Sequence, residues 1–142
     1  MIHENDMQDF MRGVVQDLKP ILQQGLLDNF VSEGHNSGRP WAQLKASTVR
    51  RRGSAHPILV RSGRLRLGVS SARCEYKNNQ IEMTVADPEY AVYHQTGTRR
   101  MIARPPLGLS QEMVSDVAEE MGEAMKDWLK ERGYEADVEV TR

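Results

Sequence analysis

The sequence predicts a single α+β domain in which a long N-terminal helix and a C-terminal helix pack on a small, mainly antiparallel sheet. Three observations point to this class: helical periodicity near both ends, two alternating segments around an asparagine pair, and a length of 142 residues, which suits one core. With 39% hydrophobic and 27% charged residues, the composition excludes a disordered chain and a membrane protein. One domain is therefore expected over residues 1–142.

The N-terminal region predicts a long helix. Apolar residues at steps of three and four form one helical face: Met7, Phe10, Met11, Val14, Leu18, Ile21, Leu22 and Leu26. Asn5, followed three residues later by Gln8, resembles a capping arrangement for its start. Pro20 lacks a backbone donor, so it is expected to kink this helix or to split it in two. The composition of residues 31–40 then predicts a flexible loop.

A short basic helix is predicted after this loop. Trp41 is expected to hold the end of the loop on the core, and Ser47 is a suitable cap for the helix that follows. That helix carries three consecutive arginines, Arg50–Arg52, and is expected to stop at Gly53.

The middle of the chain predicts an antiparallel hairpin. Residues 67–72 and 81–86 each alternate between larger apolar and smaller or polar residues, as strands do. Asn78 and Asn79 tolerate the left-handed backbone that a tight turn needs. Residues 90–95 are too few for the period to decide between a short helix and an extended segment.

The last third predicts a basic arm and a final helix. Residues 97–106 combine arginines with apolar residues, and this arm fits either a strand added to another chain's sheet edge or a hairpin on its own domain. Ser110 is expected to cap a helix that ends at Gly133, with this apolar stripe: Met113, Val117, Met121, Met125, Trp128 and Leu129. Trp41, the hairpin and Trp128 are expected in the core. A short C-terminal tail, 134–142, follows, with a short strand predicted within it.

Charges are sorted along the chain although the net charge is only -1. The net charge is -4 over residues 1–38, +9 over residues 39–104 and -6 over residues 105–142. A basic middle attracts either phosphates or an acidic protein surface, including the acidic segment of a neighbouring copy. Candidate partner contacts are therefore Arg50, Arg51, Arg52, Arg99, Arg100, Ile102 and Arg104. The alternative is a nucleic-acid-binding module that uses the same basic segment.

Catalytic and cofactor motifs are not found in the sequence. The four histidines lack metal-ligand spacing, and no nucleophile elbow or phosphate-binding glycine motif occurs. Glu119, Glu120 and Glu123 are expected on a solvated helix face, and His94 is expected to be a structural histidine bonded to the backbone. The expectation is a protein that is not an enzyme and uses no cofactor.

Four short motifs follow one another in a specific order. They read W-x-x-L-x-x-x-T, I-L-x-x-S-G-x-L-R, Y-A-x-x-H-Q-x-G and A-R-P-P-L-G-L-S. The residues that carry them here are Trp41, Leu44, Thr48, Leu59, Gly63, Leu65, Tyr90, Ala91, His94, Gln95, Gly97 and Pro105. This order resembles the phage virion morphogenesis family, the tail-completion proteins of contractile-tailed phages and their prophage relatives. The resemblance spans roughly residues 7–130.

The resemblance implies a small structural protein that acts late in virion assembly. Proteins of this kind complete the head-proximal end of the tail so that it joins a filled head, and related tail terminators form rings, commonly of six subunits. The implied partners are the tail tube, the head-tail connector and further copies of the chain. The implied locations are the host cytoplasm during assembly and then the virion; the N-terminus shows no export signal. One departure from the pattern is Thr98-Arg99-Arg100-Met101 in place of the usual aromatic or glycine-rich stretch.

Overall fold

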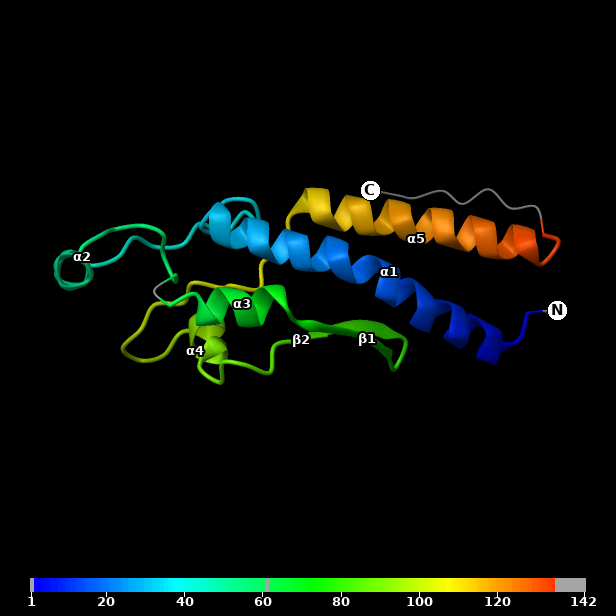
Figure 1. Cartoon of the computed structure of the whole chain (residues 1–142), viewed down its shortest axis with the longest axis horizontal. Helices are drawn as coiled ribbons and strands as arrows, with labels where there is room; N and C mark the ends of the chain where they lie inside the picture. Colours follow the sequence, from blue (N-terminus) through cyan, green and yellow to red (C-terminus); the bar gives the residue numbers. More distant parts are fainter. Residues whose placement is uncertain (1, 61, 135–142) are drawn as a thin grey trace.

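The computed structural model describes residues 2–60 and 62–134. It is a single α+β domain in which the N-terminal and C-terminal helices contact a two-stranded antiparallel hairpin, as predicted (Figure 1). In chain order the elements are α1 (Glu4–Val31), α2 (Ala46–Arg52), α3 (Arg64–Ser70), β1 (Arg73–Lys77), β2 (Gln80–Thr84), α4 (Ala91–Thr96) and α5 (Gln111–Glu131). In the described part of the chain, no helix has both the length and the apolar character needed to cross a membrane.

Helix α1 is the longest element and contributes residues to both core clusters. It begins at Glu4 rather than after Asn5, and the backbone N–H of His3 donates to the Asp6 carboxylate over 3.3 Å. The helix continues through Pro20, as the expected single helix with a bend near Lys19 requires, so of the two alternatives the split is excluded; its axis changes direction along its length in Figure 1. Packing of one face against two clusters supports it past the missing donor.

The core consists of two hydrophobic clusters arranged along α1. The first joins the end of α1 to the middle of the chain through Leu26, Phe30, Trp41, Ile58, Leu65, Val69 and Ala72. The rings of Phe30 and Trp41 meet edge to face, with centroids 5.2 Å apart. The second cluster joins the first half of α1 to β1 and α5 through Val14, Val15, Leu18, Leu22, Cys74 and Met113. Trp41 is therefore a core residue, as predicted.

The hairpin forms around the predicted turn. Asn78 and Asn79 have φ of 52° and 60°, and the strands pair antiparallel with Cys74 opposite Met83. The second strand was predicted nearly in place, but the first was not, because residues 64–70 form helix α3.

The burial of side chains in α3 follows the helical spacing of four residues and not the alternation of a strand. Leu65 and Val69 are 5% and 0% exposed, whereas Leu67, which alternation assigned to the same face as Val69, is 68% exposed. Gly68 allows this helix to lie against the next loop, since a Cβ there would come within 1.8 Å of the Asp87 carbonyl oxygen. Alternation over six residues was thus a weaker guide than the i, i+4 pair.

Helix α5 starts as predicted but buries less than predicted. The Ser110 hydroxyl accepts from the Met113 backbone N–H over 3.0 Å, and Met113 is the buried residue of the helix. Trp128 is not in either cluster; it is half-buried against Phe10, with ring centroids 4.9 Å apart, and under the Arg132 guanidinium. The short strand predicted at 136–141 lies outside the described residues.

Candidate functional site

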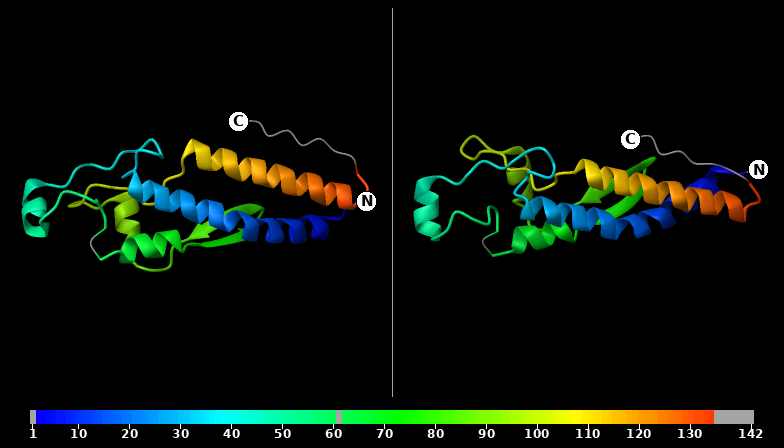
Figure 2. Two further views of the ribbon diagram at one scale, coloured as in Figure 1. Left: turned by 45° about the horizontal axis from the view of Figure 1, so that its top comes forward. Right: turned by 90° about the horizontal axis from the view of Figure 1, so that it is seen from above.

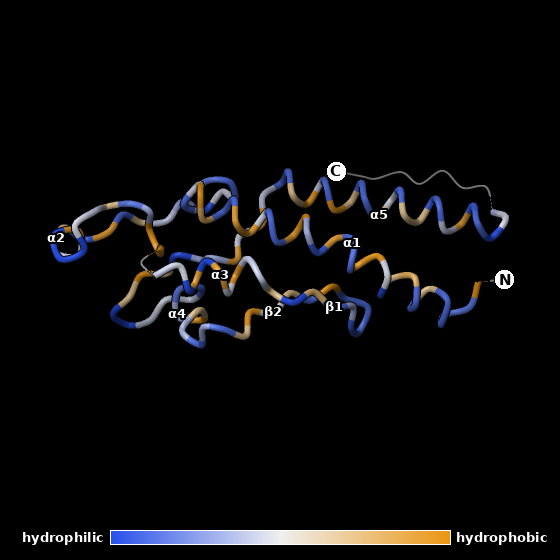
Figure 3. Tube along the Cα trace, in the orientation of Figure 1, coloured by the Kyte–Doolittle hydropathy of each residue, from blue (hydrophilic) through white to orange (hydrophobic). Residues whose placement is uncertain are grey.

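Residues 42–57 leave the body and return to it at one end of the molecule. Helix α2, within this excursion, stands away from the other elements in every view (Figures 1 and 2). It has no buried residue, and the colouring of Figure 3 shows that its residues are mostly hydrophilic. Lys45, rather than the predicted Ser47, occupies the N-cap position, while the stop at Gly53, with φ of 89°, is as predicted. Burial therefore does not explain the position of α2.

Two arginine side chains hold the excursion to the body. Arg104 donates through Nε to the Ala42 carbonyl over 2.7 Å and through Nη2 to the Gln43 carbonyl over 3.0 Å. Arg52 donates to the carbonyls of Pro57 and Val60, the latter over 2.8 Å. Both guanidinium groups thus replace the water that would otherwise solvate irregular backbone.

A carboxylate at the end of α1 fixes the return of the excursion. Glu33 accepts from the Ile58 backbone N–H and contacts Nδ1 of His56, each over 2.6 Å. Burial alone would raise the pKa of Glu33, but the hydrogen bonds from His56 and Ile58 and the charge of His56 together lower it. The ionised form of Glu33 is therefore the one that the fold favours.

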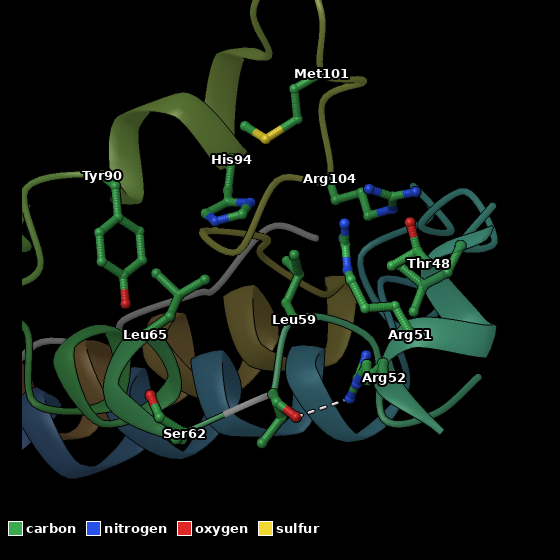
Figure 4. A pocket seen from close by; sticks show the side chains of 13 residues that line it. Thr48, Arg51, Arg52, Leu59, Ser62, Leu65, Tyr90, His94, Met101 and Arg104 are labelled. Carbon is green, nitrogen blue, oxygen red and sulfur yellow. Dashed lines mark hydrogen bonds between the residues drawn. The ribbon is translucent and has the colours of Figure 1, made fainter. Parts of the chain in front are cut away.

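A cavity of about 560 Å³ lies between α2 and the body. Its walls come from α2, from the segment before α3, from α4 and from the arm (Figure 4). The lining residues are Leu44, Thr48, Arg51, Arg52, Leu59, Val60, Ser62, Gly63, Leu65, Tyr90, His94, Met101 and Arg104. The cavity thus combines leucine and methionine walls with guanidinium, imidazole and hydroxyl groups.

The charge of this cavity is positive and uncompensated by its own walls. None of the described lining residues is Asp or Glu. Ion pairs in the described part of the chain join Arg12 to Asp9, His56 to Glu33 and Arg64 to Asp87, all outside the lining. Burial lowers the pKa of Arg104, as expected for a cation without a carboxylate partner.

His94 is not the satisfied structural histidine that was predicted. Its Nδ1 is buried and has no hydrogen-bond partner among the described residues, while its ring meets Tyr90 edge to face at 5.9 Å between centroids. Burial, and then the charge of Arg104, lower its pKa. The backbone rather than the ring makes the structural bond here: the His94 carbonyl accepts from the Arg104 N–H over 2.9 Å.

The predicted interface residues separate into two groups. Arg51, Arg52 and Arg104 line the cavity, and Arg104 is half-buried and bonded to the backbone of Ala42 and Gln43. The others lie on the surface outside it: Arg50, Arg99, Arg100 and Ile102. The arm is a tight turn on its own domain, closed by two backbone hydrogen bonds between Thr98 and Met101 of 2.8 and 3.2 Å. This is the hairpin alternative of the two considered for this segment.

The motif residues converge although their motifs are far apart in sequence. Of the twelve motif residues named above, seven line the cavity, namely Leu44, Thr48, Leu59, Gly63, Leu65, Tyr90 and His94, and Ser62 and Arg104 from the same printed motifs line it too. The Trp41 Nε1–H donates to the Pro105 carbonyl over 2.9 Å, and the Gln95 amide oxygen accepts from the Leu107 N–H over 2.9 Å. At Gly97 a Cβ would come within 2.9 Å of the Ala103 nitrogen, and Ala91 packs on the first cluster.

Some site residues were not predicted from the sequence. Val60 and Met101 also line the cavity, and of these two only Met101, which lies between arginines, gave a signal; Ser62 belongs to the second motif. Asn29, buried in α1, donates to the carbonyls of Pro105 and Pro106 over 3.2 and 3.1 Å and so fixes the segment after the arm. Nothing local distinguishes it, since it lies within a helical run.

In comparisons with known proteins, no family model, no curated protein and no solved structure matches this chain.

Proposed function

We propose that this chain is a structural phage assembly protein that completes the head-proximal end of a tail and prepares it to join a filled head. The observation that carries the proposal is the gathering of the tail-completion motifs: residues from all four line one cavity, and the fourth is also bonded to Trp41 of the first through Pro105. Motifs that only kept the fold together would be expected to disperse through the core. A shared cavity is better explained by a shared binding task.

The character of the site also favours binding over chemistry. Two of its three arginines, Arg52 and Arg104, are held by backbone carbonyls, and its walls combine apolar and cationic groups, a composition typical of protein interfaces. The proposed partners are the tail tube, the head-tail connector and further copies of the chain, in a ring at the tail end. The chain would act without a cofactor, in the host cytoplasm during assembly and then in the virion.

Deletion of the gene from the encoding phage or prophage tests this proposal. Electron microscopy of the induced lysate is expected to show filled heads beside unattached tails. Expression of the intact chain from a plasmid should restore joined particles. Normal joined virions in the deletion lysate would reject the proposal.

A charge-reversal variant tests the exposed arm. The double substitution Arg99→Glu and Arg100→Glu is expected to abolish tail joining while the circular dichroism spectrum stays unchanged, because both side chains lie outside the core. Arg73→Glu with Lys77→Glu, on the exposed side of β1, makes the same change of charge elsewhere and should leave infectivity intact. Full infectivity of the arm variant would remove the arm from the interface.

A second candidate function, nucleic-acid binding, rests on α2. Arg50 and Arg51 are exposed on a helix that buries nothing, as phosphate-contacting side chains often are. This candidate predicts duplex binding that weakens steeply with salt, because counterion release drives it. A gel shift at about 50 mM and about 200 mM salt distinguishes the candidates. Duplex binding that is lost both in the Arg51→Glu variant and in the Arg50→Glu variant would favour nucleic-acid binding.

A further inference from the structure

Arg51 is the arginine of the cavity that has no hydrogen-bond or ion-pair partner among the described residues. Its guanidinium points from α2 into the cavity, toward Arg104 and Leu59 (Figure 4). It makes no hydrogen bond or ion pair within residues 2–60 and 62–134, whereas Arg52 and Arg104 are each bound to backbone carbonyls. Guanidinium groups that face one another repel, and apolar walls strengthen the repulsion. An anion between Arg51 and Arg104 would turn this repulsion into attraction.

The rest of the lining is suited to a carboxylate carried by a protein. The buried Nδ1 of His94 lacks a partner within the described chain. Leu59, Leu65 and Met101 supply apolar walls that a small inorganic anion would not use. A volume of about 560 Å³ holds several side chains of an incoming segment. The cavity therefore suits an acidic segment with apolar neighbours.

Carboxylates gather at the opposite end of the same molecule. The start of α1 and the end of α5 lie together there, away from α2 (Figure 1). We call this region the acidic end; its carboxylates outnumber its basic residues, Arg12, Lys126, Lys130 and Arg132, and are Glu4, Asp6, Asp9, Glu123, Asp127 and Glu131. Helix α1, with 28 residues and a length of about 42 Å, runs between the two ends. Within one molecule the acidic end does not reach the cavity.

We propose that the cavity is a carboxylate-binding site whose ligand is the acidic end of a second copy of this chain. The opposite charges at the two ends make such a contact attractive in one orientation, head to tail. A head-to-tail contact uses different surfaces on each copy, so repetition builds a ring when the rotation closes. The inference rests on the proposed function, for which it names the partner of the cavity.

Sedimentation velocity on the full chain tests the contact, with matched variants. At low salt, from about 10 µM to about 1 mM protein, the wild type is expected to self-associate, and salt at about 0.5 M should reverse this. Arg51→Glu should weaken association by at least about tenfold, since it places a carboxylate where one must bind. Arg50→Glu changes the same charge on the same helix outside the cavity and should associate like the wild type.

Mixing two variants tests the direction of the contact. Glu123→Lys with Asp127→Lys should remove the acidic end, whereas Glu112→Lys with Asp116→Lys, at the other end of α5, is the matched control. Arg51→Glu and the acidic-end variant should each be monomeric alone. Together they should form a dimer and nothing larger, because Arg51→Glu retains an intact acidic end and the other variant retains an intact cavity.

The outcomes separate the inference from the proposed function. A wild type that stays monomeric up to about 1 mM, or an Arg51→Glu variant that associates like Arg50→Glu, would overturn the inference. Duplex binding that Arg51→Glu abolishes while the wild type is monomeric would also overturn it and assign the cavity to nucleic acid. Unattached tails in the deletion lysate would preserve the proposed function in either case, because that test does not depend on which surface joins the copies.

Discussion

Helices α5 and α2 differ in what holds them in place. Helix α5 has a side-chain cap at Ser110 and packs an apolar stripe along α1 and the hairpin. Helix α2 has no side-chain cap and no buried residue, and the excursion that carries it is tied down by Arg52, Arg104 and Glu33. One helix is fixed by apolar burial and the other by polar bonds at its base. The proposed binding role of α2 would account for this difference.

The largest effect on stability is expected when a side chain buried under α5 is truncated, in comparison with the same kind of change on α2. Leu18 is fully buried against α5 and β1, so Leu18→Ala should lower the free energy of unfolding by about 2–5 kcal/mol. Val49→Ala, on α2, should lower it by less than about 1 kcal/mol, because that side chain is only half-buried. Urea unfolding measures both changes, and equal losses would contradict the contrast.

An intermediate effect is expected at the base of the excursion. Glu33→Gln should cost about 1–2 kcal/mol at neutral pH, because the ionised acceptor of the Ile58 N–H is lost. The folded-state pKa of Glu33 lies below its ordinary value near 4.5, so its stabilisation is present above that value and is lost as pH falls through the folded-state pKa.

Unfolding curves at neutral and acidic pH check this prediction. The difference between wild type and Glu33→Gln should shrink as the pH is lowered. Glu89→Gln, at an exposed position on the loop before α4, should show no such trend. A constant difference at all pH values would show that Glu33 does not act through its charge.

The smallest effect on stability is expected at the two serines that were predicted as helix caps, Ser110 and Ser47, which can be compared directly. Ser110→Ala should destabilise the protein by about 1 kcal/mol, since the first turn of α5 loses the acceptor of the Met113 N–H. Ser47→Ala should be neutral within about 0.5 kcal/mol, because Ser47 lies inside α2 and is exposed. Thermal unfolding of both variants measures the difference; a cost at Ser47 like that at Ser110 would contradict the assignment of Lys45 as N-cap.

Features with local causes could be predicted from the sequence. The helical faces, the Asn78–Asn79 turn and the Ser110 cap each depend on residues a few positions apart. The first strand was misplaced because alternation over six residues competes with an i, i+4 pair, and tertiary contacts decided between them. In each correct case the interaction that fixes the structure lies within the pattern that predicted it.

The cavity could not be assembled from the sequence alone. Its residues were partly identified through motifs and charge, but their meeting depends on bonds between distant segments, such as Trp41 to Pro105 and Arg104 to Ala42. Hydrogen bonds between distant segments produce no recognisable spacing pattern in the sequence. The orientation of Arg51 and the unpartnered nitrogen of His94 follow only from the folded arrangement.

The excursion begins and ends in the same hydrophobic cluster. Trp41, 3% exposed, precedes it and Ile58, fully buried, follows it, so both of its ends are anchored in the core of the domain. Loop-closure entropy changes only slowly with length, by about 0.6 kcal/mol per doubling. Substitution, shortening or grafting within residues 42–57 is therefore expected to cost the domain little free energy of unfolding, while it would change the surface proposed for binding.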